Sequence, residues 1–171
     1  MELKLKPISK GSIPEAISKV ELYRALNEPE EAESICRDIL AADPQNQLAL
    51  RLLGLALTDQ FTGSSTHRYA EVERIFDSLA DPYERLYYTG LLYERRAKAQ
   101  LRAGHLPHTL LPLFEKAMHY FEEAEKIRPP DNDDAILRWN RCLRVLQSRL
   151  GSEWQREIEV FEAHDSPPTS G

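Results

Sequence analysis

The sequence predicts an all-α fold in which pairs of antiparallel helices stack into an α-solenoid of about four units. In three segments, an alanine opens an apolar pattern of helical period and a proline twelve residues later closes it. These pairs are Ala32 with Pro44, Ala70 with Pro82, and Ala117 with Pro129. Almost every window spaces its apolar residues by three and four, and none alternates strictly as a half-buried strand would. A recurring helical unit indicates a repeat protein that presents a surface.

About eight helices are expected. They cover residues 13–26, 29–42, 46–60, 67–79, 83–103, the residues after Pro112 up to 127, 131–150 and 152–163. The first helix follows Ser12, a residue type that caps helix N-termini, and it tolerates Pro14 in its first turn. The second ends before Pro44, because proline disfavours a helical conformation in the preceding residue. The polar run over residues 62–66 then separates the third helix from the fourth.

The later helices are delimited by glycines and acids. Gly104 is a C-cap candidate for the fifth helix, and a proline-containing connector over residues 105–112 follows it. Asp131 to Asp134 open the seventh helix, where negative charge is favourable at the positive end of the helix dipole. Gly151 separates the last helix, which Ser152 and Gln155 open as a capping box and in which Trp154, Ile158 and Phe161 share a face.

Length and composition predict one helical domain. The 171 residues suffice for a core, and we expect the domain over residues 12–163, after a mobile segment 1–11 and before a disordered tail 164–171. With 42% hydrophobic and 29% charged residues, the chain falls outside the disordered and membrane classes. Neither a signal-peptide core nor an apolar stretch of bilayer length is present. We therefore expect a cytoplasmic protein without membrane contact.

The net charge of −6 argues against a general nucleic-acid binder, because such affinity comes from clustered cations that release counterions. Two predicted helices nevertheless carry basic runs. These are Arg95, Arg96, Lys98 and Arg102 on the fifth helix, and Arg138, Arg141, Arg144 and Arg149 on the seventh. We interpret both runs as solvated helix faces, and a role for them stays open at this point.

No motif in the sequence predicts catalysis, a cofactor or a metal. A glycine-rich phosphate loop, a zinc-protease motif and a nucleophile turn are all missing. His105 and His108 lack a third ligand, and Asp131 to Asp134 lack the glycine and distant glutamate of a calcium loop. Cys36 and Cys142 stand 106 residues apart, so we expect two small apolar core residues.

The repeated segments resemble the tetratricopeptide repeat, which combines Trp-x2-Leu-Gly-x2-Tyr with Ala-x3-Phe and a closing Pro. The first-helix pattern is matched by Leu50-x2-Leu53-Gly54-x2-Leu57 and Leu86-x2-Thr89-Gly90-x2-Tyr93. The second-helix pattern is matched by Ala117-x3-Phe121 with Pro129 and by Ala32-x3-Cys36 with Pro44. The resemblance covers about residues 13–150, but the closing prolines are 38 and 47 residues apart. It therefore implies degenerate repeats with insertions.

The resemblance implies that the first helix of each pair lines a concave groove. The residues that it places there as partner-binding are Arg24, Arg51, Leu55, Tyr87, Leu91, Glu94, Arg95, Asn140 and Arg144, with Ile17, Glu21, Thr58 and Ile136 beside them. Such a mixed groove suits a peptide or helix, since aromatic and arginine side chains are common interface anchors. Ile17 and Glu21 occupy the positions where some family members have the Lys and Asn of a carboxylate clamp, so a chaperone adaptor of that type is not expected.

We therefore expect a non-catalytic scaffold or adaptor that binds another protein. One alternative is a regulatory or catalytic helical domain with a small-molecule or RNA site. Another, within the adaptor class, is a chaperone of the secretion type. The partner and the oligomeric state remain open.

Overall fold

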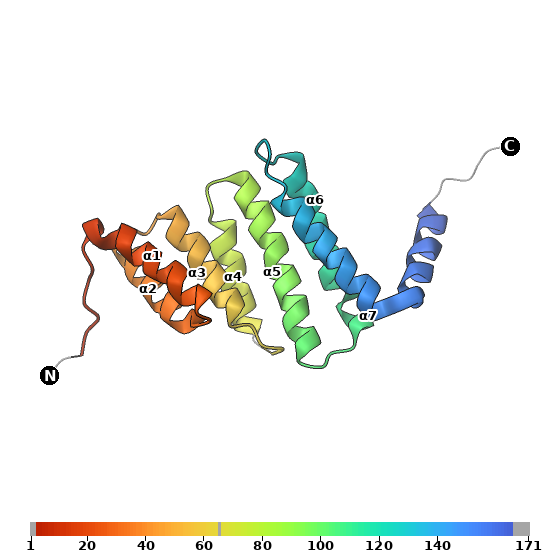
Figure 1. Cartoon of the computed structure of the whole chain (residues 1–171), viewed down its shortest axis with the longest axis horizontal. Coiled ribbons are helices and arrows are strands. Elements are labelled where there is room, and N and C mark those ends of the chain that lie inside the picture. Colours follow the sequence, from red (N-terminus) through yellow and green to blue (C-terminus); the bar gives the residue numbers. More distant parts are fainter. Residues whose placement is uncertain (1–2, 65, 166–171) are drawn as a thin grey trace.

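The computed structural model describes residues 3–64 and 66–165, and within these residues the fold is all-helical, with seven α-helices, two short 3-10 helices and no strand (Figure 1). The expectation of an all-α fold is confirmed. The elements are η1 Lys10–Ser12, α1 Ile13–Ala25, α2 Pro29–Ala42, α3 Gln47–Asp59, α4 Thr66–Asp77, α5 Pro82–Arg102, η2 Pro107–Leu110, α6 Leu111–Lys126 and α7 Asp134–Asp165. No helix of the described chain is both long and apolar enough to cross a bilayer.

The count of about eight helices is wrong by one, because residues 134–165 form a single element that is kinked at Gly151. Gly151 has φ 56° and ψ −144°, so the chain turns within one residue and needs no loop. The segment beyond it points away from the body of the molecule (Figure 1). The side chains of the expected capping box and of Trp154, Ile158 and Phe161 lie outside the described residues, as do residues 166–171 of the expected tail.

Helix α7 begins at Asp134 rather than at Asp131. Asp131 has a positive φ of 61°, which a helix cannot accommodate, and Asn132 Oδ1 accepts a hydrogen bond from the Asp134 amide at 3.0 Å. The other ends follow their local chemistry. Asn46 caps α3 by accepting from the Ala49 amide at 2.9 Å, and Gly104, with φ 93°, follows the end of α5.

The helices lie side by side in chain order along the long axis of the molecule (Figure 1). Each α-helix packs against the next, and the odd-numbered helices also contact one another, α1 with α3, α3 with α5, and α5 with α7. The odd-numbered helices therefore share one face of the molecule.

Two apolar clusters form the core, one mainly between α1 and α4 and the other mainly between α5 and α7. Leu55 and Tyr88 pack against both clusters and so join them. In each cluster a glycine of an odd helix lies directly against a buried phenylalanine. A Cβ on Gly54 would stand 2.1 Å from the Phe76 ring, and one on Gly90 would stand 2.7 Å from the Phe121 ring. The missing side chains allow these helices to approach closely.

Candidate functional site

The shared face of the odd-numbered helices contains adjoining cavities at the predicted groove. The first, of about 260 Å³, is called here the Tyr87 cavity. It is lined by Arg24, Leu55, Tyr87, Tyr88, Leu91, Arg95, Asp134 and Arg138. Five of the nine predicted partner-binding residues line it, and they come from α1, α3 and α5. The structure thus brings together side chains up to 71 positions apart in sequence.

Aromatic and aliphatic side chains form the floor of the Tyr87 cavity. The Tyr87 ring stacks on Tyr83 at 5.8 Å between centroids and contacts Phe121 at 5.9 Å. Its burial raises the pKa of Tyr87 to about 12, so the phenol is neutral at physiological pH. Leu91 is only 5% exposed. The floor of the cavity is therefore apolar, and the charged side chains that line the cavity surround it.

A second cavity, the Arg95 cavity, adjoins the first and has a volume of about 360 Å³. It is lined by Arg24, Asn27, Thr58, Asp59, Arg95, Lys98, Arg102 and Arg138. Asp59 accepts hydrogen bonds from Arg24 at 2.8 Å and from Arg95, and Arg95 also donates to Thr58 Oγ1 at 2.7 Å. Burial lowers the pKa of Arg95, and the Asp59 charge opposes this change. Asp59 therefore holds two of the predicted partner-binding residues, Arg24 and Arg95, in fixed positions.

Glu94 lies beneath the two cavities rather than on their surface. Its side chain is 0% exposed and pairs with Lys98 and with Arg138, the latter at 2.9 Å. Because Arg138 belongs to α7, this carboxylate joins α5 to α7. We infer that Glu94 positions the rim cations and does not itself meet a partner.

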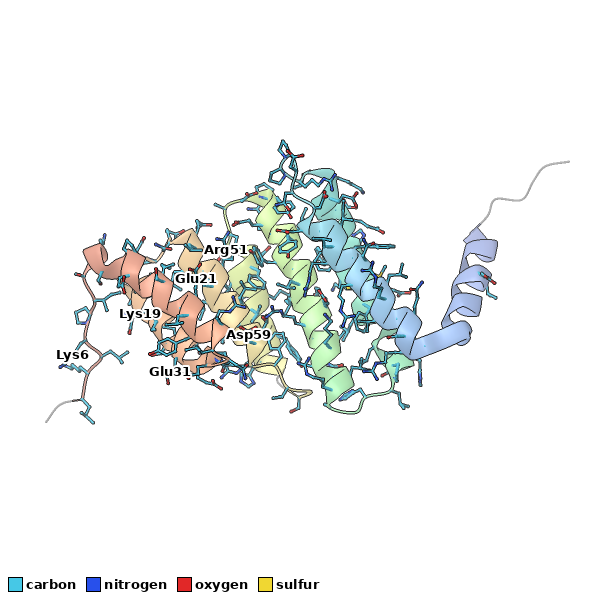
Figure 2. All side chains as sticks on the ribbon, in the orientation of Figure 1. Lys6, Lys19, Glu21, Glu31, Arg51 and Asp59 are labelled. Atoms are coloured by element: carbon cyan, nitrogen blue, oxygen red, sulfur yellow. The ribbon has the colours of Figure 1, made fainter. Side chains whose placement is uncertain are left out.

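Three predicted groove residues lie elsewhere. Arg51 pairs with Glu84 at 2.5 Å and lies over the Tyr88 ring, toward the end of α3 opposite Asp59 (Figure 2). Asn140 is half-buried and Arg144 is exposed on α7, and neither lines the two cavities. The sequence reasoning in turn missed Arg138, which lines both. Its signal was the basic run on the seventh predicted helix, which was interpreted as solvated.

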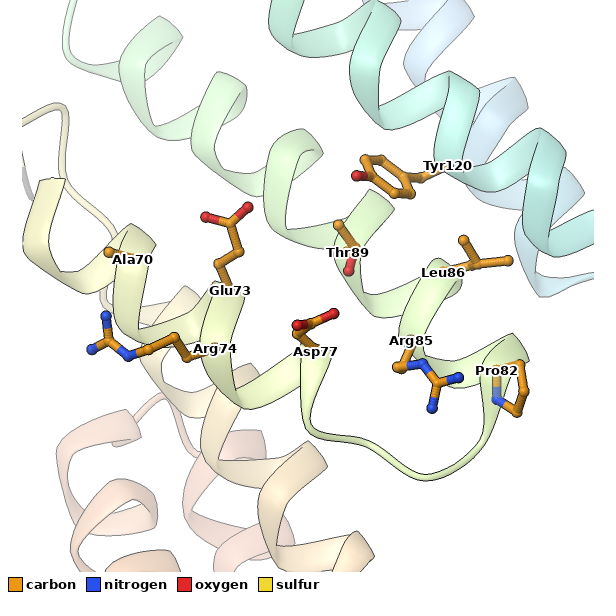
Figure 3. A pocket seen from close by; sticks show the side chains of 9 residues that line it. All are labelled: Ala70, Glu73, Arg74, Asp77, Pro82, Arg85, Leu86, Thr89 and Tyr120. Atoms are coloured by element: carbon orange, nitrogen blue, oxygen red, sulfur yellow. The ribbon is translucent and has the colours of Figure 1, made fainter.

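A larger cavity, of about 610 Å³, opens on another side, between α4, α5 and α6 (Figure 3). Two of its charged residues, Arg85 and Glu73, hold neighbouring parts of the fold in place. Arg85 donates to the Leu79 and Ala80 carbonyls at 2.7 and 3.0 Å, and Glu73 accepts from the Tyr93 hydroxyl at 3.3 Å. Tyr120 stacks on Tyr93 at 5.8 Å. These contacts belong to the packing of α4, α5 and α6, and none of the nine predicted partner-binding residues lines this cavity.

Other potentially reactive groups are placed as core. Cys36 and Cys142 are both buried, and burial raises the pKa of each thiol to about 12. Thiols of this kind are poor nucleophiles and poor metal ligands. Among the described residues, no group of three or more His, Cys, Asp or Glu side chains could hold a metal ion. The adjoining Tyr87 and Arg95 cavities are therefore the candidate site.

No family model, curated protein or solved structure matches the chain. The geometry described above is therefore the basis for proposing a function.

Proposed function

We propose that this protein is a non-catalytic scaffold or adaptor that binds a peptide or helix of a partner protein along the face of its odd-numbered helices. The proposal includes a degenerate tetratricopeptide-like repeat architecture. Two features support the repeat: the contacts between successive odd-numbered helices and the recurrent pairing of a glycine with a phenylalanine, Gly54 with Phe76 and Gly90 with Phe121. Such a stack buries a continuous core and leaves one extended surface for a partner.

One observation carries the functional proposal. The Tyr87 cavity combines an apolar floor with fixed cations, and it is an open depression formed by four different helices. Aromatic and arginine side chains in a preformed surface are the usual anchors of protein interfaces. Arg24 and Arg95 are already held by Asp59, so binding would cost little side-chain entropy.

Site-specific photo-crosslinking tests this function directly. p-Azidophenylalanine in place of Tyr87 retains an aromatic ring and places the reactive group in the candidate site. The same residue in place of Tyr120, which lines the cavity between α4, α5 and α6, is a matched control. Both variants are irradiated in an extract of the source cells, and the products are identified by mass spectrometry.

We expect one protein to be crosslinked from position 87 and not from position 120, and its crosslinked residue to map to a single segment. Crosslinks from position 120 alone, or from position 87 to nucleic acid or to no macromolecule, would contradict the proposal. Circular dichroism of both variants verifies that each retains the helical fold.

A further inference from the structure

The candidate site continues beyond the Arg95 cavity into a third depression, the Arg141 cavity, of about 260 Å³. It is lined by Lys98, Leu101, Arg102, Arg141, Val145, Ser148 and Arg149. Lys98 and Arg102 also line the Arg95 cavity, which in turn shares Arg24, Arg95 and Arg138 with the Tyr87 cavity. The three depressions therefore adjoin along α5, from Tyr87 to Arg102, and we call them together the α5 channel.

Charge in the α5 channel has the opposite sign to that of the whole protein. Among the residues that the structure describes, seven cationic side chains line it, against the two carboxylates Asp59 and Asp134, with Glu94 buried beneath. The chain as a whole carries a net charge of −6. An acidic ligand would thus be attracted to the channel and repelled by the remaining surface.

The cations of the channel are not equivalent. Arg24 and Arg95 are paired with Asp59, and Lys98 and Arg138 with Glu94. Four of the seven cations are therefore already paired with a carboxylate. Arg102, Arg141 and Arg149 are exposed, and none of them forms an ion pair with another side chain that the structure describes. All three line the Arg141 cavity, and the described residues that line it include no carboxylate. The available positive charge is therefore concentrated at one end of the channel, and the apolar floor of Leu55, Tyr87 and Leu91 lies at the other.

Resting on the function proposed above, we propose that the occupant of the α5 channel is a short protein segment with an apolar anchor at one end and a cluster of Asp or Glu at the other. The spacing follows from α5. Leu91 and Arg102 are eleven residues apart, which at about 1.5 Å per helical residue gives about 16 Å. An extended peptide covers about 3.3 Å per residue, so the anchor and the acids stand about five residues apart.

A protein segment fits the channel better than a nucleic acid. A nucleic-acid strand carries a phosphate at every nucleotide, so it would bring charge over Asp134 at the apolar end and over Asp59 in the Arg95 cavity as well as over the arginines. A peptide can confine its charge to the Arg141 cavity and place an uncharged side chain against Tyr87. The ligand therefore has to carry its negative charge at one end and an uncharged side chain at the other.

Selection from a library of random eight-residue peptides on the full chain tests this inference. We expect the enriched peptides to share an apolar residue about five positions from two or more Asp or Glu. The best enriched peptide is then titrated calorimetrically. The double variant Arg102→Gln with Arg141→Gln should weaken its binding at least tenfold. The control is the double variant Lys19→Gln with Lys126→Gln, which removes two positive charges from exposed positions outside the channel. Lys126 also matches Arg102 in its place, because each lies in the last turn of its helix. This control should leave binding within about twofold.

Several results would overturn the inference: enrichment of peptides without acids, no enrichment at all, or equal weakening by both double variants. An oligothymidylate that binds more tightly than the peptide would assign the channel to nucleic acid instead. Self-association in sedimentation that the Arg102 and Arg141 changes abolish would make a second copy of the chain the occupant. If the selection fails while Tyr87 still crosslinks one protein, the proposed function stands and only the acidic partner is excluded.

Discussion

Replacement of Gly54 by alanine should destabilise the fold through a single contact. Gly54 lies in the interior of α3, where alanine is intrinsically more stable than glycine by about 1 kcal/mol. The added Cβ would, however, stand 2.1 Å from Phe76 Cε1 and 2.6 Å from Cζ. Carbon atoms in contact are about 3.5–4.0 Å apart, so the ring would have to move by roughly 1.5 Å. Phe76 is 0% exposed, so its ring is surrounded by other side chains that would have to shift with it.

The net loss follows from these two effects. Overpacking of a dense core costs about 1–3 kcal/mol, and a contact this short with a rigid ring belongs at the upper end. After the gain in helix propensity, the free energy of unfolding should fall by about 2 kcal/mol. For a protein of this length that corresponds to a decrease of about 4–8 °C in Tm. Urea and thermal unfolding, followed by circular dichroism at 222 nm, measure both quantities.

Two further variants isolate the cause. Gly11→Ala adds a Cβ that has no heavy atom within 4 Å and should leave stability unchanged. In the background of Gly54→Ala, the change Phe76→Leu should cost less than it does in the wild-type protein, because it removes the atoms that clash. If Gly54→Ala proves as stable as the wild type, or if the two changes are additive, the close approach of α3 and α4 is not the reason for glycine at this position.

Two other predictions concern ionisable groups. Burial tends to raise the pKa of Glu33, but hydrogen bonds from Gln60 and Arg37 outweigh it and hold the pKa below its ordinary value. The folded state then binds fewer protons than the unfolded state near pH 4, so the free energy of unfolding should fall as the pH drops through this range, and more steeply in the wild type than in Glu33→Gln. Urea unfolding between pH 6 and 3 measures the two slopes, and parallel slopes would contradict the assignment. Cys36 and Cys142, with thiol pKa values of about 12, should resist Ellman's reagent at pH 8 in the folded protein and react fully in denaturant, whereas rapid reaction of either in the native state would show that it is accessible.

Local spacing was sufficient to predict most of the fold. The apolar period and the alanine–proline pairs indicated the helices. The repeat pattern also singled out Gly54 and Gly90, which the structure places against the rings of Phe76 and Phe121. The kink at Gly151 was harder to predict as part of one element, since a glycine can equally end a helix or bend the chain at one residue. Asp131 was misplaced for a similar reason, because its acid suits a helix start while its backbone has a positive φ.

In the candidate site, too, local spacing could predict some residues but not the contacts between different helices. Tyr87, Leu91 and Arg95 follow one another at intervals of four residues, so helical period places them on one face of α5, and the family resemblance indicated that this face lines the groove. Lys98 and Arg102 continue that face and could have been found in the same way. The pairing of Arg51 with Glu84 and the approach of Arg138 to Glu94 join different helices, and helical spacing contains no information about such contacts.

The buried Glu94 explains how a channel rich in cations can exist in a stable helical stack. Like charges on adjoining helices repel one another, and the apolar core beneath them cannot solvate them. Glu94 places one carboxylate between Lys98 of α5 and Arg138 of α7, and Asp59 does the same for Arg24 of α1 and Arg95 of α5. Four cations are thereby held in fixed positions, whereas Arg102, Arg141 and Arg149, which pair with no carboxylate in the described part of the chain, line the Arg141 cavity at the other end. The two carboxylates therefore neutralise the face where the helices pack together, and the positive charge that remains lies at the Arg141 cavity, where we propose that an acidic segment binds.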